Sequence, residues 1–301
     1  MVTWVVALSV VALVLVLGAV WLLGSRTTPL VTQRCTATVD GVAHELEPAQ
    51  AGYAALITAV AVRRGLPARA STIAIATAVQ ESGLRNLDFG DRDSLGLFQQ
   101  RPSQGWGTPE QLVDPVYASN AFYDALVAIE GYESLEITVA SDLVQRSAFP
   151  DAVADHEPEG RAYASALTGN SPAALACRLR PVPDDSGQVG QADVGDSGLT
   201  PGADAVVAAA TSELGEVRSE PAPSGAAAEG TQIVMSLPAQ GDTARLGWAV
   251  AQWAVASADR LDVVAVSVDG SAWRREDVDA GWVGTDGAPS AGQVLVEVAS
   301  G

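Results

Sequence analysis

The stretch Ile75-Ala-Thr-Ala-Val-Gln-Glu-Ser-Gly-Leu84 decides how this chain is interpreted. It predicts a helix that is apolar on almost all sides, and such a helix is expected to be central and buried. Gly83 stands where a glycine commonly ends a helix. The only carboxylate, Glu81, comes at the end of that helix. Because apolar surroundings resist ionisation, this carboxyl group is expected to keep its proton near neutral pH, as a general acid must.

The alternative interpretation of Glu81 is a solvated glutamate at a helix end, which is the commoner situation for this residue type. However, the last turn of a helix carries partial negative charge, which also disfavours a carboxylate there. Groups with a strongly perturbed pKa tend to mark functional sites. The pattern therefore favours a catalytic carboxyl group and the acid/base chemistry of a glycosidase.

A second motif, Ser94-Leu-Gly-Leu-Phe-Gln-Gln-Arg101, follows after about ten residues and predicts a short hairpin strand. Together the two motifs resemble the Glu-Ser and Gly-Leu-x-Gln motifs of the lysozyme-like, soluble lytic transglycosylase superfamily. The resemblance covers residues 45–170. It implies an α-helical lysozyme-like fold, a peptidoglycan glycan strand as substrate, and Glu81 as the acid/base.

The same resemblance implies roles for other residues. Ser82 would orient the substrate or the glutamate, and Gln99, with its neighbour Gln100, would line the cleft. Tyr163, in the stretch Arg161-Ala-Tyr163, would act as the cleft tyrosine. Trp106 lies between two glycines and would stack on a sugar ring; a place in the core is an equally good interpretation of this tryptophan.

The number of catalytic carboxyl groups distinguishes a hydrolase from a transglycosylase. A hydrolase needs a second carboxylate near the acid, and Asp91 and Asp93 are the candidates, although nearby arginines offer both a plain ion pair. A transglycosylase needs Glu81 alone, because the sugar's own 6-hydroxyl replaces water as the nucleophile. The Glu-Ser resemblance favours the route with a single acid.

Composition excludes some partners. The formal net charge is −19 and there is no lysine, so a nucleic-acid partner is not expected, because such binding depends on a basic surface. The two histidines, His44 and His156, fit no zinc-binding spacing. We therefore expect neither a metal nor a cofactor.

Residues 2–24 carry no charge. At about 1.5 Å per residue they span roughly 34 Å, enough for a bilayer core of about 30 Å. An uncleaved membrane anchor is therefore expected over residues 1–24, followed by a juxtamembrane segment over residues 25–44. A cleaved signal peptide is the weaker alternative, because no clear cleavage site follows. The resulting expectation is a single-pass membrane protein whose bulk is extracellular.

The two cysteines, Cys35 and Cys177, bracket the region of the Glu81 motif. A bridge between them would close a loop of about 140 residues, stabilise the fold by about 5 kcal/mol on the chain-entropy model, and require an oxidising compartment. Two unrelated buried thiols are the alternative.

Three regions follow the juxtamembrane segment in this interpretation. Five predicted helices and a short β-hairpin make residues 45–180 a mainly α domain. Residues 181–202 are predicted to be an acidic flexible linker. Residues 203–301 show a pattern of helices and strands that predicts a small α/β module.

The C-terminal module resembles a domain at the end of actinobacterial envelope proteins. Its Trp248 and Trp253 are better explained as core than as ligand contacts, because they follow helical spacing. Neither Cys nor His occurs after Cys177, so the module lacks a thiol nucleophile and its base. We expect this module to bind, with an envelope protein as a possible partner. For the chain as a whole we expect peptidoglycan cleavage, and the alternative is a non-catalytic glycan-binding or scaffold protein.

Overall fold

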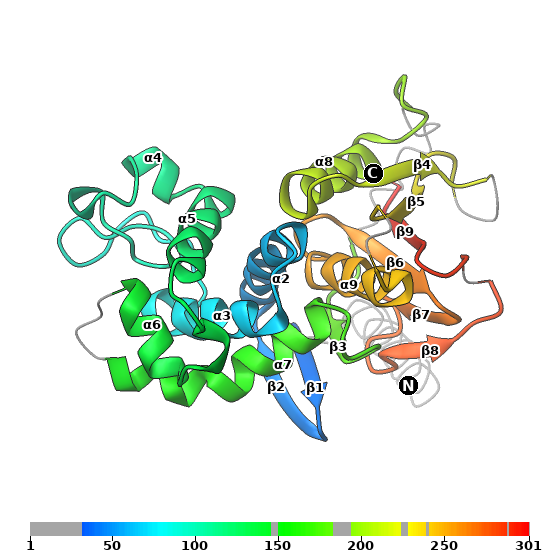
Figure 1. Ribbon diagram of the computed structural model, residues 1–301. Coiled ribbons are helices and arrows are strands. Elements are labelled where there is room, and N and C mark those ends of the chain that lie inside the picture. The colour runs from blue at the N-terminus through cyan, green and yellow to red at the C-terminus, as the bar shows by residue number, and fades with distance from the viewer. Residues whose placement is uncertain are drawn as a thin grey trace, which may run out of the picture. The chain divides into compact units, whose positions relative to one another are not determined.

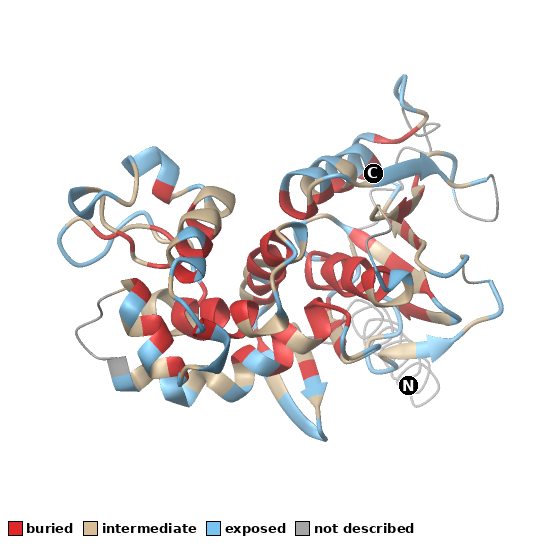
Figure 2. Cartoon of the chain, in the orientation of Figure 1, coloured by how far each residue is buried: buried red, intermediate tan, exposed pale blue. Residues whose placement is uncertain are grey.

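Two helices, α2 (Pro48–Arg63) and α3 (Ala68–Ser82), lie at the centre of the first half of the chain (Figure 1). The computed structural model describes residues 32–145, 150–182, 194–223, 228–238, 241–287 and 289–300. Pro48 stands at the first position of α2, where its missing N–H costs no helical hydrogen bond. Both helices are buried over most of their length (Figure 2), as the sequence predicts for α3.

Helix α7 (Glu157–Leu167) packs closely on α3. The approach depends on Gly160. A Cβ atom at this position would lie 2.9 Å from the Thr72 carbonyl oxygen and 3.2 Å from the Ala76 backbone nitrogen. Since no side chain fits in that space, the glycine sets the distance between the two helices.

Shorter helices cover the outer side of this pair. They are α4 (Pro109–Leu112), α5 (Pro115–Val127) and α6 (Ile137–Gln145), with the 3-10 turns η1 (Pro102–Gln104), η2 (Tyr132–Ser134) and η3 (Pro150–His156). Asp114 caps the start of α5, because its carboxylate accepts a hydrogen bond of 2.9 Å from the Val116 N–H.

A three-stranded antiparallel sheet stands beside these helices, in the order β2 (Val42–Leu46), β1 (Arg34–Val39) and β3 (Leu175–Arg178). Cys35 and Cys177 are opposite each other in the β1–β3 register. They form a disulfide bond, so the predicted pairing is confirmed. The bond joins the two ends of the chain segment that contains Glu81.

The second sheet has six antiparallel strands in the order β4-β5-β9-β6-β7-β8. Their bounds are Arg218–Pro221, Gln232–Ser236, Val294–Val298, Val263–Val268, Ser271–Arg274 and Trp282–Gly284 in that order. Helix α9 (Thr243–Ala256) packs on this sheet, and α8 (Pro201–Leu214) contacts its strand β9. Trp248 and Trp253 of α9 are buried, as predicted.

The helices and the second sheet are held together by buried hydrogen bonds, and the described residues from Gln33 onward form one compact unit. The side chain of Gln252 on α9 is fully buried. Its Oε1 accepts from the Leu175 N–H at 2.8 Å, and its Nε2 donates to the carbonyl oxygens of Ala166 at 2.6 Å and Ser171 at 3.1 Å. Half of the predicted linker, residues 183–193, lies outside the described residues.

The predicted fold class needs correction. The first region is not a mainly α domain with only a hairpin, because its strand β3 forms a sheet with β1 and β2, which lie largely in the predicted juxtamembrane segment. The second contains a six-stranded antiparallel sheet, of which β4, β7 and β8 were not predicted. These strands have three or four residues each and lack a clear alternation of apolar and polar residues. Local patterns are weak signals for strands of this length.

The expectation of a single-pass membrane protein is corrected as well. Across the ranges that the structure describes, no helix has both the length and the apolar character needed to cross a bilayer. The predicted anchor, residues 1–24, lies outside those ranges. The proposals below therefore do not use a membrane location.

Candidate functional site

Glu81 lies in the last turn of α3 and is half-buried. Burial raises the pKa of its carboxyl group above the ordinary value. Among the described residues, none donates a hydrogen bond or forms an ion pair to this carboxyl group. Gly83 follows in the left-handed conformation, with φ of 63°, and ends the helix as predicted. The structure thus places a carboxyl group with raised pKa at a helix end.

The Ser82 hydroxyl fixes this helix end to the second motif. Its Oγ lies 2.7 Å from the Leu97 carbonyl oxygen and 3.1 Å from the Ala78 carbonyl oxygen, so its single proton has two acceptors. The same Oγ accepts a hydrogen bond of 3.2 Å from the Arg85 N–H. Because these contacts occupy the hydroxyl group, the geometry favours a role for Ser82 in orienting Glu81 over direct contact with a substrate.

The second motif forms a tight turn and not a regular hairpin strand. Leu95 and Gln100 make an isolated antiparallel bridge, and Gly96 makes another with Leu87. Gly96 has φ of 75°, and a Cβ atom there would overlap the Leu112 carbonyl oxygen. Only glycine fits, which explains the Gly-Leu pair of the motif.

The two glutamines of the motif have different environments. Gln99 adopts φ of 48°, and its Nε2 donates to the carbonyl oxygens of Gly96 at 3.2 Å and Phe89 at 3.4 Å. Gln100 is 2% exposed, and neither atom of its carboxamide group has a hydrogen-bond partner among the described residues. Gln99 thus holds the loop before the motif, and the side chain of Gln100 is buried in the protein.

Tyr163 and Trp106, the two aromatic residues predicted to contact the substrate, both pack against other parts of the protein. Tyr163 is fully buried, and its hydroxyl lies 2.7 Å from the Cys35 carbonyl oxygen and 3.2 Å from that of His44. Burial also raises its pKa. These contacts bind Tyr163 to the first sheet, and they favour a structural role. Trp106 is half-buried against the core, and its carbonyl oxygen accepts a hydrogen bond of 3.3 Å from Tyr117.

The two candidate second carboxylates lie in different environments. Asp93 accepts hydrogen bonds from Arg101 Nε at 2.7 Å and from the Ser103 N–H at 2.8 Å, and these contacts lower its pKa. Asp91 has a side chain that is 94% exposed, with Arg92 Nε at 3.9 Å. Asp93 is thus held by two donors, whereas Asp91 faces solvent.

One residue near the site was not predicted from the sequence. Gln145, at the end of α6, donates from Nε2 to the Phe98 carbonyl oxygen at 2.6 Å. Its buried Oε1 has no partner among the described residues. One turn earlier, Thr77 on α3 and Ser141 on α6 share a hydrogen bond of 2.9 Å. Gln145 is thus adjacent to the motif that Ser82 holds. Gln145 follows Ser141 by four residues, just as Glu81 follows Thr77. This shared spacing points to Gln145 only once α3 and α6 are known to pack together.

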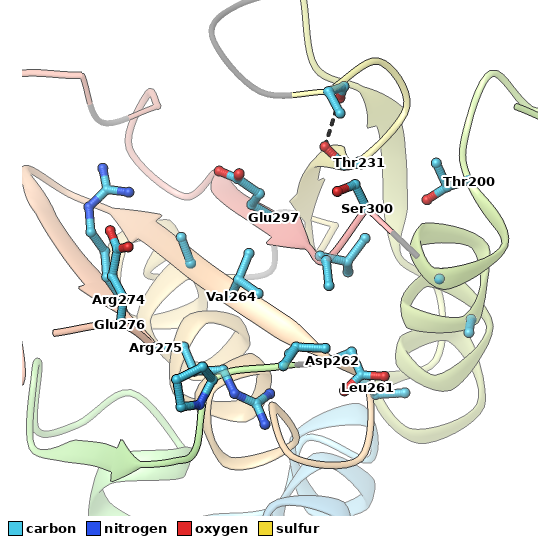
Figure 3. A pocket seen from close by; sticks show the side chains of 18 of the residues that line it. Thr200, Thr231, Leu261, Asp262, Val264, Arg274, Arg275, Glu276, Glu297 and Ser300 are labelled. Carbon is cyan, nitrogen blue, oxygen red and sulfur yellow. Dashed lines mark hydrogen bonds between the residues drawn. The ribbon is translucent and has the colours of Figure 1, made fainter. Parts of the chain in front are cut away.

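A separate pocket of about 720 Å³ lies on the second sheet (Figure 3). It is lined by the first turn of α8, by β6 and β9, and by residues 274–276. Its buried cation, Arg275, already donates to the carbonyl oxygens of Arg180 at 2.6 Å and Ala258 at 2.9 Å. None of the predicted site residues lines it, and we assign it no function.

No protein-family model matches this chain, and no curated protein sequence matches it significantly. Within the described ranges, no three His, Cys, Asp or Glu side chains lie close enough together to hold a metal ion.

Proposed function

We propose that this protein cleaves the glycan strands of peptidoglycan, with Glu81 as its acid/base. The observation that carries the proposal is the half-buried carboxyl group of Glu81, whose pKa is raised at the end of an apolar helix. A group of this kind keeps its proton to a higher pH than an ordinary glutamic acid and can deliver it to a leaving oxygen. The substrate class comes from the resemblance of the two motifs to those of lytic transglycosylases.

The reaction needs one carboxyl group in two protonation states. Protonated Glu81 first donates its proton to the glycosidic oxygen as the bond between that oxygen and C1 breaks. The resulting Glu81 carboxylate then removes the proton of the 6-hydroxyl of the same sugar, whose oxygen attacks C1 and closes a 1,6-anhydro ring. Glu81 regains its proton, so the cycle is balanced. The contacts of Asp93 with Arg101 and Ser103 support this route, since they engage both of its carboxylate oxygens.

Mass spectrometry of digested peptidoglycan tests the proposal. We expect products with anhydro-muramyl ends when purified wall material is incubated with the full chain in ¹⁸O-labelled water. Products with reducing ends that carry the labelled oxygen would make the protein a hydrolase. Absence of cleavage, with an intact fold and an intact disulfide, would contradict the proposed function.

A further inference from the structure

Phe89 is an exposed aromatic residue in the loop between the two motifs. Its side chain is 68% exposed. Among the described residues it is the only aromatic one with a largely exposed apolar side chain; the others are aliphatic. A single exposed apolar residue is common in proteins, so its position must decide whether it has a function.

The loop that carries Phe89 is fixed by the second motif. Gln99 Nε2 donates a long hydrogen bond of 3.4 Å to the Phe89 carbonyl oxygen. A Cβ atom on the next residue, Gly90, would overlap Gln99 Oε1 and lie 2.7 Å from the Ser94 carbonyl oxygen. The backbone beside Phe89 is therefore packed tightly on Gln99, and the phenyl ring extends from an anchored segment.

The same motif connects this loop to Glu81. Ser82, next to Glu81, holds the Leu97 carbonyl oxygen at 2.7 Å. Leu97 and Gln99 are two residues apart, which corresponds to at most about 7 Å of chain. Ser82, the neighbour of Glu81, and the backbone of Phe89 thus both contact the same short turn.

We propose that the Phe89 ring is a sugar-binding subsite, on which one pyranose of the glycan strand stacks while Glu81 acts on a neighbouring linkage. The apolar C–H face of a pyranose carries slight positive charge, and the face of a phenyl ring is negative, so the two attract each other. Gln99 is then a positioning residue that holds the loop. The identity of the ligand rests on the proposed function, whereas the subsite itself rests on the exposure and anchoring of Phe89.

Binding can be measured without cleavage in a Glu81→Gln background. Pull-down with insoluble purified peptidoglycan should show binding by this variant. Adding Phe89→Ala should weaken binding roughly 3- to 10-fold, the range of one aromatic contact, and Phe89→Trp should restore it. The matched control is Val42→Ala, which removes another exposed apolar side chain from a strand of the first sheet and should leave binding unchanged.

Kinetics and a second variant complete the test. With Glu81 present, Phe89→Ala should raise KM by a similar factor and leave kcat nearly unchanged. Gln99→Ala should produce the same change in KM, and the double variant should add little, because both substitutions remove one subsite.

The outcomes separate the two proposals. Binding that depends on Phe89 in a protein that never cleaves the strand would support the subsite and contradict the proposed function. Cleavage with unchanged KM and unchanged binding in Phe89→Ala would overturn the subsite alone. Failure of the Glu81→Gln protein to bind peptidoglycan would overturn the subsite too.

Discussion

Two carboxyl groups, the half-buried Glu81 and the buried Glu213, show why a raised pKa needs a structural context. Burial raises the pKa of both. However, Glu213 accepts hydrogen bonds from Trp253 Nε1 at 2.7 Å and from Arg260 Nη2 at 2.9 Å, which engage both of its oxygens. The carboxyl group of Glu81 has no such donor among the described residues. The contacts of Glu213 join two parts of the structure, and the acid/base role is proposed for Glu81 alone.

Replacing Glu81 by glutamine keeps the shape of the side chain and removes the proton that the proposed mechanism transfers. Glu81→Gln should therefore lower the rate of glycan cleavage by at least about 100-fold, the low end of a general acid/base contribution. Release of soluble fragments from peptidoglycan is the measurement. Glu130→Gln, at an exposed glutamate, is the control and should keep full activity. Equal rates for the two variants would remove Glu81 from the mechanism.

The raised pKa of Glu81 also predicts how stability depends on pH. Between the ordinary value of 4.5 and the raised value, the folded state holds a proton that the unfolded state has lost. The free energy of unfolding therefore falls as pH rises through this window. Glu81→Gln removes the effect, so near neutral pH the variant should melt at a higher temperature than the wild type. Calorimetry should show this difference shrinking towards about pH 4; a difference that grows at low pH would contradict the assignment.

At the scale of elements, the sequence predicted most helices and missed much of the sheet structure. Helices α2, α5 and α9 carry local signals: Pro48 at a first turn, and capping by Asp114 and Asp242. The β1–β3 pairing had no local signal, since Cys35 and Cys177 are 142 residues apart. Because the sequence analysis assigned β1 to a juxtamembrane segment, it did not predict that the Tyr163 hydroxyl contacts the carbonyl oxygens of Cys35 and His44.

The same limit applies to the candidate site. Glu81 and Ser82 were predicted because they belong to one short motif with a recognisable neighbour in the sequence. The contact between Gln145 and the Phe98 carbonyl oxygen joins residues 47 positions apart. It depends on how α6 packs against the turn of the second motif, and no spacing within α6 reveals that. The exposure of Phe89 likewise depends on a loop shape that composition does not determine.

Because α7 packs closely on α3, a Gly→Ala substitution in α7 should have the opposite effect on stability from the usual one. Within a helix, Gly→Ala normally stabilises by about 0.5–1 kcal/mol. Gly160→Ala should instead destabilise by about 1–3 kcal/mol, because the added methyl group meets the Thr72 backbone. Gly52→Ala in α2 is the matched control, since its Cβ would have a normal contact of 3.6 Å with the Ala256 carbonyl oxygen. Urea unfolding of both variants measures the difference, and stabilisation by Gly160→Ala would contradict the close packing.

At the scale of the molecule, the disulfide joins the first strand of the described chain to the last strand of the first sheet. On the chain-entropy model a loop of this size is stabilised by about 5 kcal/mol. The double variant Cys35→Ala with Cys177→Ala should therefore unfold at a clearly lower urea concentration than the oxidised wild type. Reduced wild type should behave like the variant. Alkylation of both thiols in the unreduced, denatured protein would show that the bond is absent.

The last prediction concerns the coupling of the two sheets through Gln252. Gln252→Leu keeps a similar volume but leaves the Leu175 N–H and the Ser171 carbonyl oxygen without their buried partner, whereas the Ala166 carbonyl oxygen keeps its hydrogen bond from the Gly169 N–H. At roughly 1–3 kcal/mol for each unsatisfied group, the substitution should lower the free energy of unfolding by at least about 2 kcal/mol.

The control is Gln104→Leu at an exposed position, which should change stability little. In the wild type, tryptophan fluorescence and loss of cleavage should follow a single unfolding transition, because four of the seven tryptophans belong to the region of the second sheet and Glu81 to the helical region. Two separate transitions in the wild type would show that the regions unfold independently. In that case Gln252 would not couple them, and the site around Glu81 would owe its stability to the helices and the disulfide alone.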